Sequence, residues 1–146
     1  MSEVRLGLTI TRVLAAPRER VWREWTEPEA FADWFGGPDA DVPPETVAMD
    51  VRPGGAWRAT MRYGGREIRW IGEYREVEPP ARLVFTITDR PEEDDRELVV
   101  VALTDVGDGR TEMVVEQHGH MSPADYDAAR NGWGGFLDRM AERLQA

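Results

Sequence analysis

The residues of this chain that could hold a metal ion are few and lie close to one another. His118 and His120 are the only histidines, and two residues apart on a strand they would point the same way, with Glu116 or Asp125 as a further ligand. A firm site needs three or more ligands, and the spacing fixes no third one. We therefore predict no metal site and interpret the histidines as the polar end of a strand before Ser122.

The chain offers no nucleophile in a setting typical of an enzyme. It has no cysteine, which excludes disulfides, thiol catalysis and iron–sulfur ligation. Ser2 stands near the start of the chain and Ser122 is interpreted as a helix cap, while many carboxylates fall in loops such as residues 89–95. Gly54 and Gly55 lack the strand–loop–helix context of a phosphate-binding loop. We therefore predict no catalytic residues and no cofactor, and we favour a binding protein while leaving enzymatic activity open.

Apolar side chains alternate along the predicted strands, and near the chain end they recur every three or four residues. Both patterns would turn these side chains toward one interior. Ligand pockets are mostly apolar with a few placed polar groups, and aromatic residues and methionine are suited to lining them. We predict a ligand-binding set whose polar members, Tyr74 and Gln117, could each fix a hydroxyl or carbonyl group. The set is Trp57, Met61, Ile68, Trp70, Tyr74, Phe85, Val101, Met113, Gln117, Trp133, Leu137 and Met140.

A solid core would produce the same alternating pattern. Burial of a large aromatic side chain stabilises a fold by about 1.5–3 kcal/mol whether or not a ligand is present. The pattern therefore leaves two alternatives open, an interior with space for a small molecule and an interior filled by its own side chains.

Most of the residues that would position this set belong to a run of predicted strands. Strands are predicted at residues 5–14, 46–51, 57–63, 67–77, 83–87, 99–103 and 113–117. Gly64-Gly65 and Asp108-Gly109 predict hairpin turns, because such turns need positive φ angles. The spacing therefore predicts an antiparallel sheet of six or seven strands.

Three helices are predicted around these strands. A short helix starts at Pro17 and a second follows a capping box formed by Thr26 and Glu29. The last helix is the clearest, because Ser122 is a good N-cap and an apolar stripe continues to Leu144. It contains three glycines that each cost up to about 1 kcal/mol relative to alanine, so close packing or room for a ligand must compensate. They are Gly132, Gly134 and Gly135.

An amphipathic helix and strands with one apolar face must cover each other. The sequence therefore predicts an α+β helix-grip fold. In this fold a curved antiparallel sheet wraps around the long C-terminal helix, and two short helices after the first strand close one end.

The length and charge of the chain restrict its class. A chain of 146 residues suits one domain, residues 1–146. Its net charge is −10 and all 18 basic residues are arginine, so nucleic acid and anionic membranes are poor partners. No apolar run approaches the ~18 residues of a membrane helix, and the first residues do not resemble a signal peptide. We expect a cytoplasmic protein, either a monomer or a homodimer.

Several short motifs follow one another along nearly the whole chain. They are ITRVLAAP at residues 10–17 with Val21 and Trp22, Trp34-Phe35, Pro53-Gly54-Gly55 before Trp57, GEYREV at 72–77, PPARLVF at 79–85, and Gly132-Trp133. With the order of the elements, they resemble the START-like (SRPBCC) superfamily, which includes the Bet v-like helix-grip proteins. Within it, the chain is similar to the bacterial branch named for homology to the activator of Hsp90 ATPase.

The resemblance implies that an apolar or polyaromatic small molecule binds between the sheet and the last helix, in the setting of secondary metabolism. Because one scaffold carries many functions, three alternatives stay open. One is a polyketide cyclase or dehydratase, with Tyr74, Gln117 and His118 as the nearest acid–base candidates. Another is a self-sacrificing antibiotic-resistance protein, which binds a reactive enediyne and is cleaved by it near Gly72 or the helix glycines. The third is a co-chaperone-like module that binds a protein partner.

Overall fold

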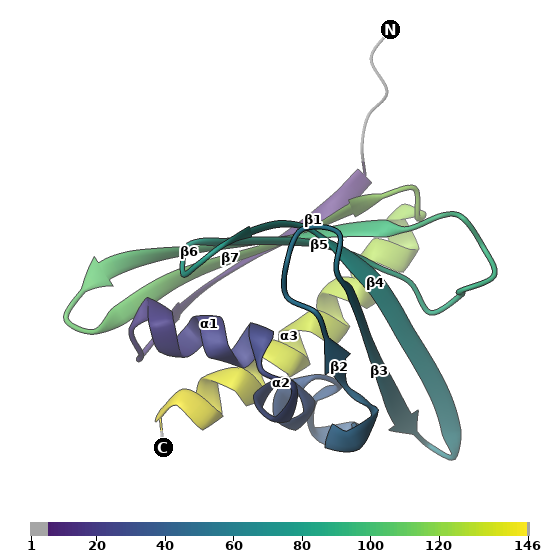
Figure 1. The fold of residues 1–146 in the computed structure, drawn as a ribbon, viewed down its shortest axis with the longest axis horizontal. Helices are drawn as coiled ribbons and strands as arrows, with labels where there is room; N and C mark the ends of the chain where they lie inside the picture. The colour runs from purple at the N-terminus through teal and green to yellow at the C-terminus, as the bar shows by residue number, and fades with distance from the viewer. Residues whose placement is uncertain (1–5, 146) are drawn as a thin grey trace, which may run out of the picture.

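The computed structural model describes residues 6–145, and it places one antiparallel sheet over three α-helices (Figure 1). The predicted α+β helix-grip fold is confirmed. Arg5, where the first strand was predicted to begin, lies outside the described residues. The elements are β1 (Leu6–Leu14), α1 (Arg18–Thr26), α2 (Pro28–Trp34), the 3₁₀ helices η1 (Gly37–Asp39) and η2 (Pro44–Thr46), β2 (Ala48–Met49), β3 (Ala56–Tyr63), β4 (Arg66–Glu78), β5 (Arg82–Ile87), β6 (Glu97–Gly107), β7 (Arg110–Gly119) and α3 (Pro123–Gln145).

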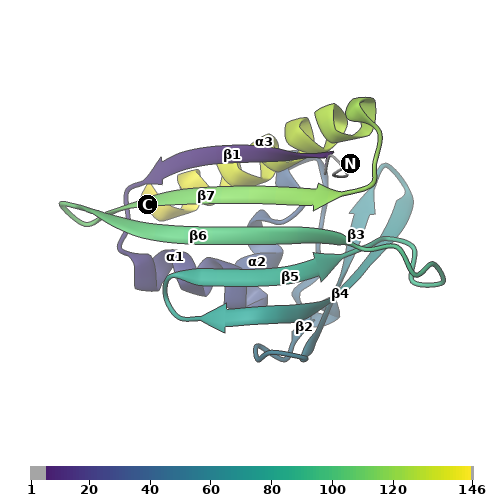
Figure 2. The same ribbon diagram turned by 90° about the horizontal axis from the view of Figure 1, so that it is seen from above.

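The seven strands lie in the order β1-β7-β6-β5-β4-β3-β2, and neighbouring strands are antiparallel (Figure 2). The Gly64-Gly65 turn between β3 and β4 is confirmed, with positive φ at both glycines. The strand predicted at 46–51 shrinks to the two residues of β2, because Thr46 ends η2 and its hydroxyl donates to the Pro43 carbonyl (2.7 Å). Proline cannot donate to a strand ladder, so the two prolines before Thr46 delay the strand.

The sheet curls because β4 changes its partner near its middle. Its first part pairs with β3 as far as Glu73, and its last part pairs with β5 from Tyr74 onward. At the changeover the Thr86 carbonyl accepts a hydrogen bond from the Trp57 indole (2.9 Å), while the Thr86 hydroxyl accepts from the Glu73 backbone N–H (3.0 Å). Side-chain bonds thus replace ladder bonds at this point, and the β3–β4 hairpin bends toward the helices (Figure 1).

Gly72 makes this bend possible. It lies opposite Trp57 in the β3–β4 ladder, and a Cβ at this position would overlap the Thr86 carbonyl oxygen and the Trp57 indole nitrogen. Only a residue without a side chain lets the indole cross the strand and reach that carbonyl.

Of the two helix caps predicted from the sequence, one is confirmed and the other is wrong. The N-cap of α3 is confirmed, since the Asp125 backbone N–H donates to the Ser122 hydroxyl (3.1 Å). The capping box predicted for the second helix is wrong. Thr26 is the last residue of α1, its hydroxyl donates to the Trp22 carbonyl (2.9 Å), and α2 begins at Pro28 without a side-chain cap. Proline lacks an N–H, so the first helical position there needs no cap.

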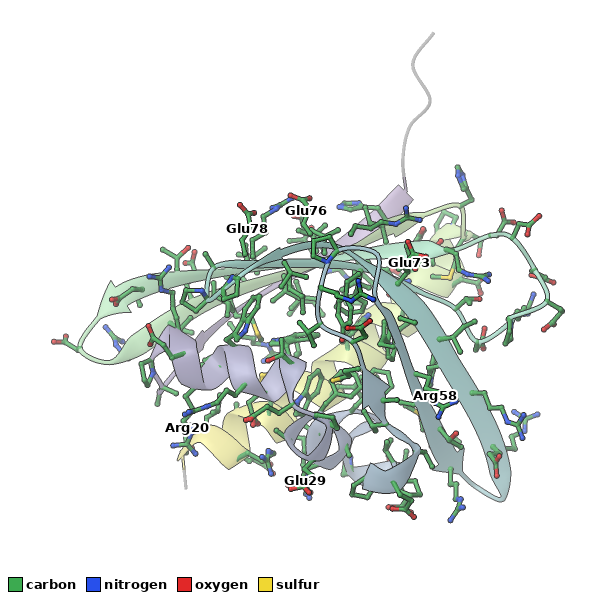
Figure 3. The ribbon with its side chains drawn as sticks, viewed as in Figure 1. Arg20, Glu29, Arg58, Glu73, Glu76 and Glu78 are labelled. Carbon is green, nitrogen blue, oxygen red and sulfur yellow. The ribbon has the colours of Figure 1, made fainter. Side chains whose placement is uncertain are left out.

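The core lies between the helices and the inner face of the sheet. α3 turns its buried stripe toward that face with Tyr126, Trp133, Leu137, Met140 and Leu144. The opposite face of the sheet is outermost, and Glu76 and Glu78 point away from the helices there (Figure 3). None of the helices within residues 6–145 is long and apolar enough to cross a membrane.

Candidate ligand-binding site

The twelve residues predicted to bind a ligand come from β3, β4, β5, β6, β7 and α3, and the fold turns them toward one interior. Ten of them are buried, whereas Ile68 and Trp70 of β4 are partly exposed. The eleven other than Gln117 belong to, or pack against, one apolar cluster. The structure therefore brings the predicted set together.

Phe35 is the centre of this interior, and the predicted ligand-binding set missed it. Its ring packs against the rings of six residues on four elements, and the centroid distances run from 4.5 Å to 6.3 Å. These residues are Phe31, Trp34, Trp57, Trp70, Trp133 and Phe136. The sequence signal was the spacing of Phe31, Trp34 and Phe35, which puts all three on the apolar side of the second short helix. That spacing predicts burial but does not tell which strands the ring meets.

Two hollows open at the surface of the described residues. One of about 560 Å³ runs between β1 and α3 beside Arg12, Arg130 and Gly134. The other, of about 230 Å³, lies between α2, the 3₁₀ helices and α3, beside Asp33 and Arg139. None of the twelve predicted residues lines either hollow, but Phe35, whose ring contacts several of them, lines the smaller one.

Gln117 is engaged by its neighbours. Its amide nitrogen donates to Glu97 (3.2 Å), and its amide oxygen accepts from the Trp133 indole (2.8 Å). Glu97 also accepts from the Tyr126 hydroxyl (2.6 Å) and from the His120 backbone N–H (3.2 Å). Gln117 therefore joins β7 to α3, and a ligand that used its amide would have to displace one of these bonds.

Tyr74 stays protonated in its buried position. Burial, and secondarily the nearby Asp50 carboxylate, raises the pKa of the Tyr74 phenol far above its ordinary value. A general base must be able to hold the proton that it removes near the working pH. Tyr74 can therefore take part in hydrogen bonds but is a poor acid or base.

The acid–base candidates and the metal candidates do not come together. His118 lies on the face of β7 opposite to Gln117, where its ring lies 3.3 Å from the Glu116 carboxylate. His120 is exposed beyond the end of β7, and Asp125 lies in the first turn of α3. Among the residues that the structure describes, no three His, Asp or Glu side chains are placed to share a metal ion.

One part of the inner face remains partly uncovered. Ile68 and Trp70 are partly exposed, and the Trp70 ring packs edge-on to Phe35 (6.1 Å between centroids). Phe35 packs in turn on the partly exposed Phe136 of α3 (5.3 Å). Gly132 lies one helical turn before Phe136, and a Cβ there would have no non-local neighbour within 4 Å. We call Ile68, Trp70, Gly132 and Phe136 the rim.

Close packing does not explain the three glycines of α3. A Cβ at Gly132 or Gly135 would have no non-local neighbour within 4 Å, and at Gly134 only Arg12 would come as near as 3.8 Å. The interpretation that close packing requires them is therefore wrong.

Alanine at each of these three positions is expected to raise the free energy of unfolding by up to about 1 kcal/mol, because alanine is the better helix former. Urea unfolding of the single variants Gly132→Ala, Gly134→Ala and Gly135→Ala measures the effect. Lower stability in all three would show that α3 packs more tightly there than the structure indicates.

The sequence model of the family "Activator of Hsp90 ATPase homolog 1-like protein" matches residues 15–145. The chain belongs to this family. The resemblance noted in its motifs is therefore confirmed, from the end of β1 to the last turn of α3. No curated protein matches the sequence.

Solved structures of similar fold include the AHSA1 protein from Silicibacter pomeroyi (20% identity, TM-score 0.84), with 96% of this chain and 98% of that chain covered. A protein from Chromobacterium violaceum has 24% identity and a TM-score of 0.85, with 96% and 97% covered. CalU16 from Micromonospora echinospora has 22% identity and a TM-score of 0.71, with 96% and 76% covered. At these identities the likeness supports the helix-grip fold of the family.

Proposed function

We propose that this protein binds an apolar, ring-bearing small molecule between the β3–β4 hairpin and α3. The observation that carries the proposal is the rim, whose three apolar side chains pack against the aromatic core yet stay partly exposed. Covering apolar surface gains about 25 cal/mol per Å². Contiguous exposed apolar surface on a folded protein commonly marks a binding site.

The ligand first stacks on Trp70 and Phe136, which both pack on Phe35. Deeper entry requires Phe35 to move, because its ring occupies the centre of the interior. Met61 on the inner face of β3 helps such a rearrangement, since methionine adapts its shape at little cost. The site is thus one that a ligand opens.

A matched pair of helix variants tests this location. Leucine at Gly132 would fill the rim, whereas leucine at Gly134 would lie on the side of α3 that faces β1, and neither Cβ meets a close neighbour. We expect Gly132→Leu to weaken binding of 1-ethylnaphthalene at least about tenfold, equivalent to 1.4 kcal/mol. Gly134→Leu should change the dissociation constant less than about twofold.

Binding is followed by NMR of the ¹⁵N-labelled indole groups, with the melting temperature of each variant as a check on folding. In the unmodified protein the Trp70 signal should move most. The proposal fails if 1-ethylnaphthalene moves no indole signal up to its solubility limit. It also fails if the two leucine variants bind equally well.

A further inference from the structure

Trp70 differs from the other deeply placed tryptophans in the pairing of its indole N–H. The other four N–H groups each have an acceptor at 2.8 to 3.4 Å. The pairs are Trp25 with the Met113 sulfur, Trp34 with the Glu24 carbonyl, Trp57 with the Thr86 carbonyl, and Trp133 with the Gln117 amide oxygen. The Trp70 Nε1 is buried, and no residue of the described chain accepts its proton. A buried donor without an acceptor is costly, so an exception at a partly exposed site requires an explanation.

No buried residue that the structure describes supplies positive charge near this donor. The buried polar residues among 6–145 are Glu24, Thr86, Thr111 and Gln117, and none of them is a cation. Arg69 lies on the opposite face of β4 from Trp70. Arg66 shares the inner face but is exposed at the hairpin tip, four residues and about 13 Å of strand from Trp70. On α3, Arg139 donates to the Asp33 carbonyl beside α2.

These two observations together define the chemistry of the ligand. Resting on the proposed function above, we infer that the ligand is an uncharged aromatic compound with a ketone or quinone oxygen, which accepts the Trp70 Nε1–H once the rearrangement that opens the site uncovers this buried atom. A carboxylate or phosphate placed beside Trp70 would lose its water without gaining a cation, and this penalty is large. A pure hydrocarbon would leave the donor unpaired. The neutral carbonyl compound is the class that avoids both costs.

Three naphthalene compounds of similar shape separate these classes: 1-acetonaphthone, 1-ethylnaphthalene and the anion 1-naphthoate. At pH 8 we expect the ketone to bind about fivefold more tightly than the ethyl compound, a ratio typical of one hydrogen bond. Naphthoate should bind at least about tenfold more weakly than the ketone. Dissociation constants come from calorimetry on the full chain.

Trp70→Phe supplies the decisive variant, because it keeps an aromatic ring and removes the indole N–H. The smaller ring also offers less stacking surface, but this loss is common to both naphthalene compounds and cancels in the ratio of their dissociation constants. We expect the preference for the ketone over the ethyl compound to fall to about one. Trp22→Phe is the matched control, since Trp22 lies on α1 and outside the rim, and the preference should persist in it. In the ¹⁵N-indole spectrum, the ketone should move the Trp70 proton downfield, whereas the ethyl compound should not.

The outcomes distinguish this inference from the proposed function. Equal binding of the ketone and the ethyl compound, with no effect of Trp70→Phe on their ratio, overturns the inference and leaves the proposed function standing. Tightest binding of naphthoate also overturns it, because a cation such as Arg66 would then be in reach. Failure of all three compounds to bind removes both together.

Discussion

Replacing Gly72 with alanine is expected to lower the free energy of unfolding by about 3 kcal/mol, the upper range for overpacking. The added methyl group would overlap the Thr86 carbonyl oxygen and the Trp57 indole nitrogen that donates to it. One of these atoms belongs to a strand backbone and the other to a buried ring, so neither can move freely. Relief would require the bend of β4 to open. For a domain of this size we expect a fall in melting temperature of roughly 6–12 °C.

Gly132→Ala is the matched control for this prediction, because it adds the same methyl group where no non-local atom lies within 4 Å. Urea unfolding followed by circular dichroism compares the two variants under one set of conditions. The account of the bend would be wrong if Gly72→Ala were as stable as Gly132→Ala.

Loss of Arg143 is the second large effect that we expect. Its guanidinium joins the three helices, since it donates twice to Glu24 of α1 (2.8 and 3.1 Å) and once to Asp33 of α2. Hydrogen bonding to Glu24 is the main cause that raises the pKa of Arg143, so the charged form is favoured. The Glu24 side chain is only 7% exposed, and Arg143→Ala would leave its carboxylate buried without a cation. We expect a loss of about 3 kcal/mol, measured by urea unfolding at pH 7.

Two further variants test whether the expected loss comes from the unpaired Glu24 carboxylate or from the lost packing of the Arg143 side chain. Arg12→Ala removes the Arg12–Asp138 ion pair (3.1 Å), whose side chains are 37% and 65% exposed, and should cost less than about 1 kcal/mol. Adding Glu24→Gln to Arg143→Ala removes the stranded charge and should restore about 1 kcal/mol. If the double variant is no more stable than Arg143→Ala, lost packing rather than an unpaired carboxylate explains the effect.

These two features constrain the two elements, β4 and α3, that carry the rim. The Gly72 bend brings the inner face of β4 toward the helices, and the Arg143 contacts fix the end of α3 against α1 and α2. Trp70 lies two residues before Gly72 on β4, Phe136 lies about two turns before Arg143 on α3, and both are partly exposed. The bend and the Arg143 contacts hold the backbone of these two elements in place, while entry of the proposed ligand between the hairpin and α3 depends on movement of side chains such as Phe35.

Much of the fold could be predicted because the signals are local. Strict alternation in β3 and β7 fixed which side chains face inward, since successive residues of a strand point to opposite faces. Ser122 placed the start of α3 because a cap acts on an amide only three residues away. The cap predicted at Thr26 is wrong, and the reason is again local. The Thr26 hydroxyl donates to the Trp22 carbonyl one turn earlier in α1 and so does not cap α2.

By itself the sequence determined the order of the elements, the inward faces of the strands and the family to which the chain belongs. Only the tertiary structure decided which partners those faces meet. It engaged Gln117 with Glu97 and Trp133, gave Gly72 its role in the bend, and left the Trp70 N–H without an acceptor. Periodicity specifies a direction within one element, whereas a hydrogen bond or a clash depends on atoms brought from elsewhere in the chain.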